Sequence, residues 1–272
     1  MKIIVPTDFS KFARNAVDYA ADFAVKHNAE LILLHTYLFR YSESSFFIDY
    51  DQSVKEVAKN QLTIEKNRII EEFPGLKKSQ ITLRCEVGGL IENIDRFNKD
   101  VSLVIMGTKG RSGWEEVLIG SQAASVIENC DIPVLVIPKK AKFEKQSKIA
   151  YAVDFSTDLS EKDLDLMQFF VSKKTDLNLF HNYTKAIDID SDKESELTEK
   201  FKSSFPDANS VLLDLGFDDS KVANLEEYLH ELKPSMVVAK SRHKNFFQKI
   251  FSVSVTKTLA YHMEVPLLVL KE

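Results

Sequence analysis

The first half of the sequence returns in the second half, so the chain must adopt a fold that is built twice. Residues 2–10 (KIIVPTDFS) and 148–156 (KIAYAVDFS) both run from an apolar stretch into Asp-Phe-Ser. Near the end of each half, residues 131–137 (DIPVLVI) match residues 264–270 (EVPLLVL). A repeat that spans half of the chain indicates two copies of one domain. We expect domains at residues 1–138 and 148–272, joined by a basic, aperiodic linker.

Short apolar runs alternate with amphipathic stretches in the first half. Strands are predicted at residues 3–5, 31–35, 81–87, 103–106 and 134–137, and helices at 11–27, 52–73, 90–97 and from about 120 onward. These strands lack polar alternation, which is typical of strands covered on both faces. The pattern predicts the α/β class: a parallel, doubly wound sheet in each half, with ligands bound beyond the carboxyl ends of the strands.

Two local features refine this outline. Ser10 stands directly before the first predicted helix, where a serine side chain caps backbone N–H groups. Residues 37–50, rich in aromatic residues and serine, interrupt the alternation between the second strand and the second helix. We interpret this stretch as a flap or a partner contact.

A glycine-rich stretch follows the fourth predicted strand. Gly107, Gly110 and Gly120 are separated by two and then nine residues, and Ser121 comes next. Glycine permits positive φ and lets a ligand approach backbone N–H groups. The helix that begins near Gly120 adds unpaired donors and partial positive charge, and Ser121 is expected to cap it or to donate to a phosphate oxygen. The spacing predicts a phosphate-binding loop; a tight surface turn is the alternative.

Composition excludes several classes of function. The net charge of −5 and the sequence pI near 5.8 provide no attraction to nucleic acid or anionic membranes. Cys85 and Cys130 have no metal-ligand spacing and predict neither a disulfide nor a zinc site. Because no apolar run approaches a membrane span and the N-terminus lacks a signal-peptide pattern, we expect a cytoplasmic protein.

Catalytic motifs are missing from the sequence. It contains no G-x-S-x-G, no H-E-x-x-H and no Walker lysine after the glycines. His35 and His181 each close a strand and are interpreted as structural. Lys109 and Arg111 flank Gly110, either to neutralise phosphate charge or as solvated loop cations. We expect no dedicated enzymatic activity, with slow incidental hydrolysis of bound ATP left open.

The two Asp-Phe-Ser strand ends, the glycine spacing and the closing IPVLVI resemble the universal stress protein family in its tandem two-domain form. The resemblance implies a five-stranded parallel sheet in each domain, in the order 3-2-1-4-5, and an adenine nucleotide (ATP, ADP or AMP) in the first domain. Family members pair through their last strand. Residues 134–137 and 267–270 are therefore implied to join the halves as an internal pseudo-dimer, while further homodimerisation is left open.

The resemblance also implies a role for individual residues. Pro6, Thr7 and Asp8 would meet the adenine and ribose, Val87 the adenine, Met106 and Gly107 the ribose side, and Gly110, Gly120, Ser121 and Gln122 the phosphates. The alternative role of Asp8 is to cap the helix that starts near Ser10. Asp8 is also the one nearby carboxylate that could reach Mg²⁺, and whether Mg²⁺ accompanies the nucleotide is left open.

The second half loses the glycines. Positions that correspond to glycines 107, 110, 113 and 120 hold Lys240, His243, Phe246 and Val253, and only Ser254, which matches Ser121, is retained. Side chains would occupy the phosphate space, so we expect no ATP there. The sequence thus predicts an ATP- or AMP-responsive regulatory stress-response protein; a nucleotide-free interaction protein of the same fold is the alternative. A phospho-accepting receiver is unlike this chain, which lacks the required acidic residues.

Overall fold

A computed structural model describes residues 1–38, 45–97, 99–108, 119–144, 147–153, 159–181, 191–214, 228–241 and 265–271. The chain divides into two compact units, Met1–Phe143 and Glu144–Glu272. The boundary between them falls inside the segment 138–147 that the sequence suggested as a connection.

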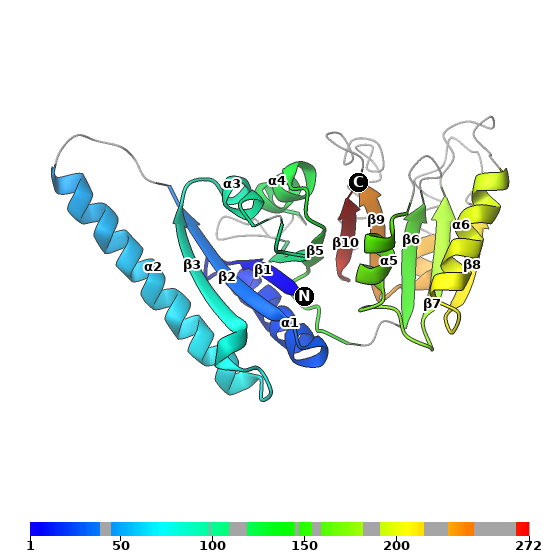
Figure 1. Cartoon of the computed structure of the whole chain (residues 1–272), viewed down its shortest axis with the longest axis horizontal. Coiled ribbons are helices and arrows are strands. Elements are labelled where there is room, and N and C mark those ends of the chain that lie inside the picture. Colours follow the sequence, from blue (N-terminus) through cyan, green and yellow to red (C-terminus); the bar gives the residue numbers. More distant parts are fainter. Residues whose placement is uncertain are drawn as a thin grey trace. The chain divides into compact units, whose positions relative to one another are not determined.

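The first unit is a parallel sheet covered by helices (Figure 1). Its elements are β1 (Lys2–Pro6), α1 (Lys11–His27), β2 (Glu30–Tyr37), α2 (Ser45–Glu72), the 3₁₀ turn η1 (Lys78–Gln80), β3 (Ile81–Val87), α3 (Leu90–Asp95), β4 (Leu103–Gly107), α4 (Ser121–Asn129) and β5 (Val134–Ile137). The strands pair in the order β3-β2-β1-β4-β5. The predicted 3-2-1-4-5 order is therefore confirmed.

Helix α1 begins and ends as its sequence predicts. The Ser10 hydroxyl accepts a hydrogen bond from the Ala13 N–H at 3.2 Å, which confirms Ser10 as the N-cap. Asn28 ends the helix in the left-handed conformation, and its N–H bonds to the Ala24 carbonyl. A row of alanines with Tyr19 and Phe23 is buried against the sheet.

Helix α2 begins earlier than predicted. It has 28 residues, about 42 Å of helix, and includes residues 45–50. Tyr37 belongs to β2. The interpretation of residues 37–50 as a flap or partner contact stays a prediction, and residues 39–44 lie outside the described residues. Figure 1 shows α2 beside β3, with its N-terminal end leading away from the sheet.

Helices α1 and α2 are joined by a charged cluster. Arg68 of α2 bonds to Asp18 of α1 at 2.5 Å and to Glu65 of its own helix at 2.7 Å. Burial raises the pKa of Asp18, and the Arg68 guanidinium opposes that shift. Burial alone would lower the pKa of Arg68, but the hydrogen bonds from Arg68 to Glu65 and Asp18 outweigh burial and raise that pKa. The cluster fixes the two helices side by side on one face of the sheet.

Part of the expected linker is packed onto the first unit. The Asn15 amide donates to the carbonyls of Pro138 at 2.7 Å and Ala141 at 3.1 Å. The Phe143 ring contacts Tyr19 and Phe23 edge-on, at centroid distances of 5.2 and 5.5 Å. A single aromatic side chain thus anchors a segment whose composition is otherwise polar.

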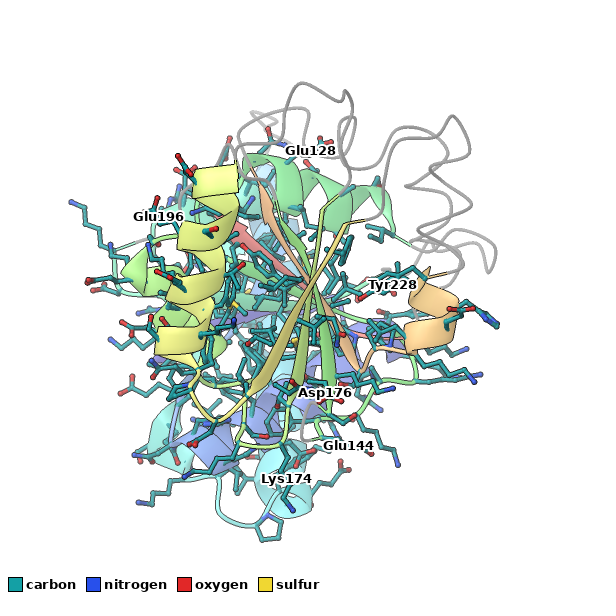
Figure 2. The ribbon with its side chains drawn as sticks, turned by 90° about the vertical axis from the view of Figure 1, so that its right-hand side faces the viewer. Glu128, Glu144, Lys174, Asp176, Glu196 and Tyr228 are labelled. Carbon is teal, nitrogen blue, oxygen red and sulfur yellow. The ribbon has the colours of Figure 1, made fainter. Side chains whose placement is uncertain are left out.

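The second unit repeats this architecture. It contains β6 (Lys148–Val153), α5 (Glu161–Met167), β7 (Asp176–His181), α6 (Ser191–Ser204), β8 (Asn209–Asp214), β9 (Met236–Ser241) and β10 (Leu267–Lys271). Its parallel strands pair in the order β8-β7-β6-β9-β10, which again is 3-2-1-4-5. Figure 2 shows α6, which carries Glu196, on one side of this sheet and Tyr228 on the other. Burial raises the pKa of Tyr228 to about 12.

Two further expectations can be compared with the described residues. None of their helices combines the length and hydropathy that a membrane span requires. Cys85 and Cys130 both lie in the described part of the chain, and neither forms a disulfide.

Candidate functional site

The turn after β1 is held by its own side chains. Pro6 ends the strand, and the Thr7 N–H donates to the Leu34 carbonyl of β2 at 2.9 Å. The Thr7 hydroxyl accepts the Phe9 N–H at 3.1 Å, and the Asp8 carboxylate accepts the Ser10 N–H at 3.0 Å. Asp8 therefore supports Ser10, the residue that caps α1, and is not the helix cap that its alternative interpretation predicts. These bonds fix the turn at the carboxyl edge of the sheet.

Strand β4 ends beside this turn. Its register with β1 pairs Ile3 with Leu103 and Ile4 with Val104, so Pro6 and Met106 lie at the same level two residues further on. Beyond Gly107, the Thr108 carbonyl accepts the Gly120 N–H at 2.7 Å. This bond returns the chain to the end of β4 and places the start of α4 next to it.

Gly107 is required by packing. A Cβ atom at this position would lie 2.7 Å from the Phe12 carbonyl oxygen in the first turn of α1. Helix α1 thus approaches β4 closely only because residue 107 has no side chain. The sequence did not predict this role, because glycine spacing along the chain contains no information on the distance between a helix and a strand.

The start of α4 presents backbone donors. Gly120 is the N-cap, and the first bond within the helix runs from the Ala124 N–H to the Gly120 carbonyl. The N–H groups of Ser121, Gln122 and Ala123 precede that bond, and the cap residue offers them no side-chain acceptor. Ser121 and Gln122 are exposed. The start of α4 can therefore donate hydrogen bonds to an anion.

Two expectations about this stretch are wrong. Gly120 has φ −68° and ψ 160°, which any residue adopts, so positive φ is not the reason for a glycine here. Ser121 does not cap α4, because it is the first helical residue and Gly120 occupies the cap position.

The structure brings most of the predicted site residues together. The β1 turn, the end of β4 and the start of α4 bring Pro6, Thr7, Asp8, Met106, Gly107, Gly120, Ser121 and Gln122 to one edge of the sheet. Gly110, with its neighbours Lys109 and Arg111, lies outside the described residues.

Val87 lies apart from this group. It ends β3 opposite Tyr37 of β2, whereas Pro6 of β1 lies opposite Leu34. Two strand spacings across the sheet and three residues along β2 separate Val87 from Pro6 by about 14 Å. A ligand would have to extend over the end of β2 to contact both residues.

Several neighbours of the site had no signal in the sequence. Thr108 is buried and closes the loop before α4, and Phe12 provides the carbonyl that excludes a side chain at residue 107. His35 had been interpreted as structural, and its Nδ1 does lie 2.8 Å from the Thr7 carbonyl. Because a carbonyl only accepts, Nδ1 carries the hydrogen. His181 ends β7, and its side chain is not described.

The corresponding place in the second unit holds an ion pair. Lys240 of β9 pairs with Leu270 of β10, as Gly107 of β4 pairs with Ile137 of β5. Its ammonium group lies 2.8 Å from the Asp163 carboxylate of α5, and each side chain is 4% exposed. Lys240 thus fills the space between strand and helix that Gly107 leaves to Phe12.

Helix α5 also begins later than the repeat predicts. Its N-cap is Ser160, whose hydroxyl accepts the Asp163 N–H, whereas the alignment with Ser10 pointed to residue 156. Residues 154–158 and 242–264, which include His243, Phe246, Val253 and Ser254, lie outside the described residues. Among the residues that are described, no group of three or more His, Cys, Asp or Glu side chains forms a metal site.

Comparison with known proteins agrees with this architecture. The model of the universal stress protein family matches residues 1–138. Universal stress protein MJ0577 of Methanocaldococcus jannaschii is 32% identical over 157 residues, which cover 51% of this chain and 95% of that protein. Universal stress protein MJ0531 of the same organism is 29% identical over 52% of this chain and 84% of its own length.

A solved structure covers both units. The crystal structure of a universal stress protein from Archaeoglobus fulgidus aligns with 99% of this chain and 98% of its own, with a TM-score of 0.69 and 19% identity. At that identity the likeness shows the fold alone. Together with the family model, which spans half of the sequence, it supports one conclusion: the chain belongs to the universal stress protein family.

Proposed function

We propose that the first unit binds an adenine nucleotide, ATP or AMP, and that the bound nucleotide regulates the protein. The proposal rests mainly on one observation: the β1 turn, the end of β4 and the exposed start of α4 lie together at one edge of the sheet. One end of this site is rich in backbone donors, and the other contains a carboxylate and a hydroxyl. A nucleotide has matching chemistry, with an anionic tail and a hydroxylated sugar.

The phosphates would bind at the start of α4. The amides of Ser121 and Gln122 donate to phosphate oxygens, the positive end of the helix dipole faces them, and the Ser121 hydroxyl supplies one more donor. Gly120 contributes by having no side chain that covers these amides. Gly110, on the same loop, is assigned to the phosphates by its place in the glycine spacing.

The nucleoside would lie over the ends of β1 and β4. The Asp8 carboxylate accepts hydrogen bonds from ribose hydroxyls or the adenine amine, beside Pro6 and Thr7. Met106 and Gly107 form the ribose side. Val87 contacts the adenine only if the base extends about 14 Å from Pro6, which makes it the least supported member of the set.

The second unit would not bind nucleotide in this way. The Lys240–Asp163 pair occupies the end of β9, and the glycines of the first loop have no counterparts in the sequence. We therefore propose one nucleotide per chain. The protein would respond to nucleotide in the cytoplasm without a dedicated reaction, with the last strands of its two halves joined as a pseudo-dimer.

Calorimetric titration tests the proposal. ATP, ADP and AMP are titrated into the intact protein, with Mg²⁺ and then with EDTA, and we expect saturable binding of one nucleotide per chain. Two nucleotides per chain would contradict the proposed difference between the units. Absence of binding for all three would support the alternative, a nucleotide-free interaction protein. That alternative is favoured by the structural roles that Gly107 and Asp8 have without any ligand.

A further inference from the structure

A cavity of about 390 Å³ opens between α2 and the carboxyl end of β2 in the first unit. Phe9 and His35 form its side toward the sheet, and residues 53–61 of α2, with Val54, Val57 and Ala58, form the opposite side. Its wall is almost wholly apolar. The volume lies within the range of pockets that hold small organic ligands.

The backbone conformation of Phe9 and a hydrogen bond from its N–H fix the aromatic wall of the cavity. Phe9 has φ 62°, in the left-handed region that bulky residues rarely adopt, and the Thr7 hydroxyl holds its N–H. This conformation places the Phe9 ring against His35, with centroids 4.7 Å apart and planes tilted by 31°. The two rings form a preorganised surface against which another ring can stack.

His35 supplies one directed polar atom. Its Nδ1 donates to the Thr7 carbonyl, so in the neutral ring the other nitrogen, Nε2, is an acceptor. Among the residues that the structure describes, Nε2 has no hydrogen-bond partner. Ser53 and Gln61 of α2 also line the cavity, but its surface is almost wholly apolar. Together with the His35 acceptor, this surface matches an uncharged ligand that has an aromatic body and a single donor.

We propose that this cavity binds a neutral phenolic compound, whose ring packs between the Phe9–His35 pair and α2 and whose hydroxyl donates to His35 Nε2. Charged ligands are disfavoured, because the apolar wall offers an ion nothing in exchange for its hydration. The site lies at α2 and the β2 end, so it is a second input to the protein and does not depend on nucleotide at α4.

Equilibrium dialysis of the full-length protein with 2-naphthol tests this proposal, and 2-methoxynaphthalene, which lacks the hydroxyl hydrogen, is the comparison. We expect saturable binding of one 2-naphthol per chain, about fivefold tighter than the methyl ether. His35→Phe should make the two affinities equal while keeping a ring beside Phe9. Equal affinities in the wild type, or no saturable binding, would overturn the proposal.

The helix offers a matched pair of variants. Val57 and Ile64 are 62% and 57% exposed on α2, two turns apart, and of the two only Val57 lines the cavity. Val57→Trp should weaken 2-naphthol binding about tenfold by filling the space, and Ile64→Trp should leave it within about twofold. Equal losses would overturn the location. Because nucleotide is absent throughout, the outcome is independent of whether the protein binds ATP.

Discussion

The close approach of α1 to β4 makes Gly107→Ala a quantitative test of the structure. The new Cβ would lie 2.7 Å from the Phe12 carbonyl oxygen and 3.0 Å from its carbon, where ordinary contacts begin at 3.4 Å. Strand or helix must therefore move by about 0.7 Å within a close-packed core. Both atoms belong to the backbone, so no side-chain rotation relieves the overlap. We expect the free energy of unfolding of the first unit to fall by about 1–3 kcal/mol.

Hydrogen exchange in β4, a strand of the first unit, followed at increasing urea concentration measures this change. Gly89→Ala is the control, because Gly89 lies in the same unit at φ −69° and the nearest neighbour of a new Cβ there is a Glu92 side-chain atom at 3.8 Å. The control should cost less than about 1 kcal/mol.

Gly107→Ala should also change the affinity for the proposed nucleotide. Phe12 comes two residues after the Ser10 cap, so a displaced α1 also displaces the Thr7–Ser10 turn. If Gly107→Ala unfolds at the urea concentration of the wild type, the packing of α1 on β4 is not as described, and the explanation of this glycine fails.

Three further predictions concern single sites. Gly120→Val should lower the ATP affinity measured by calorimetry about tenfold or more. It should change the free energy of unfolding by less than about 1 kcal/mol, since valine readily adopts φ −68°, and an unchanged affinity would place the phosphates elsewhere. Lys240→Met should destabilise the second unit by about 3–5 kcal/mol, because the buried Asp163 carboxylate would lose its counter-charge and keep only the hydrogen bonds from the Ser160 N–H and hydroxyl. Asp163→Leu in addition should restore part of that loss; hydrogen exchange in β9 measures both, and a single variant no worse than the double would argue against a buried pair. Burial, and next the Lys26 charge, lower the pKa of His27, so as the pH falls the unfolded chain takes up a proton before the folded chain does. The first unit should therefore lose stability as the pH falls below about 6.5. The urea midpoints at about pH 7.5 and 5.5 should differ less in His27→Asn than in the wild type, and an equal difference in both proteins would contradict this.

Local patterns in the sequence were sufficient to predict the strands at residues 81–87 and 134–137. Residues 134–137 have the predicted bounds because an apolar run bounded by polar or turn residues is a local property of the chain. Residues 81–87 also have the predicted bounds, although they alternate apolar with polar residues and form a partly exposed strand. Ser10 caps α1 for the same reason, since a cap depends on residues three positions apart. The order of the strands came from the family resemblance, and the pairing in both units confirms it.

The reasons behind the site residues could not be predicted, because they depend on distances between elements. The spacing of the glycines pointed to the edge of the sheet where the β1 turn and the start of α4 lie, but the need for Gly107 comes from Phe12, which is far away in the sequence. The offset of Val87 from Pro6 depends on how far β2 extends beyond β1. The packing of Phe143 on α1 depends on a groove that exists only after folding.

The two units share the order of their sheets but differ where the fourth strand of each ends. In the first unit α1 begins at Lys11, five residues after β1 ends, and lies in backbone contact with Gly107. In the second, α5 begins at Glu161, eight residues after β6 ends. A lysine at residue 240 excludes such a contact, and the third residue of the later helix, Asp163, compensates the buried charge. The identity of one residue at the end of the fourth strand is thus coupled to the position at which the first helix begins, and with it to the shape of the turn that a nucleotide would meet.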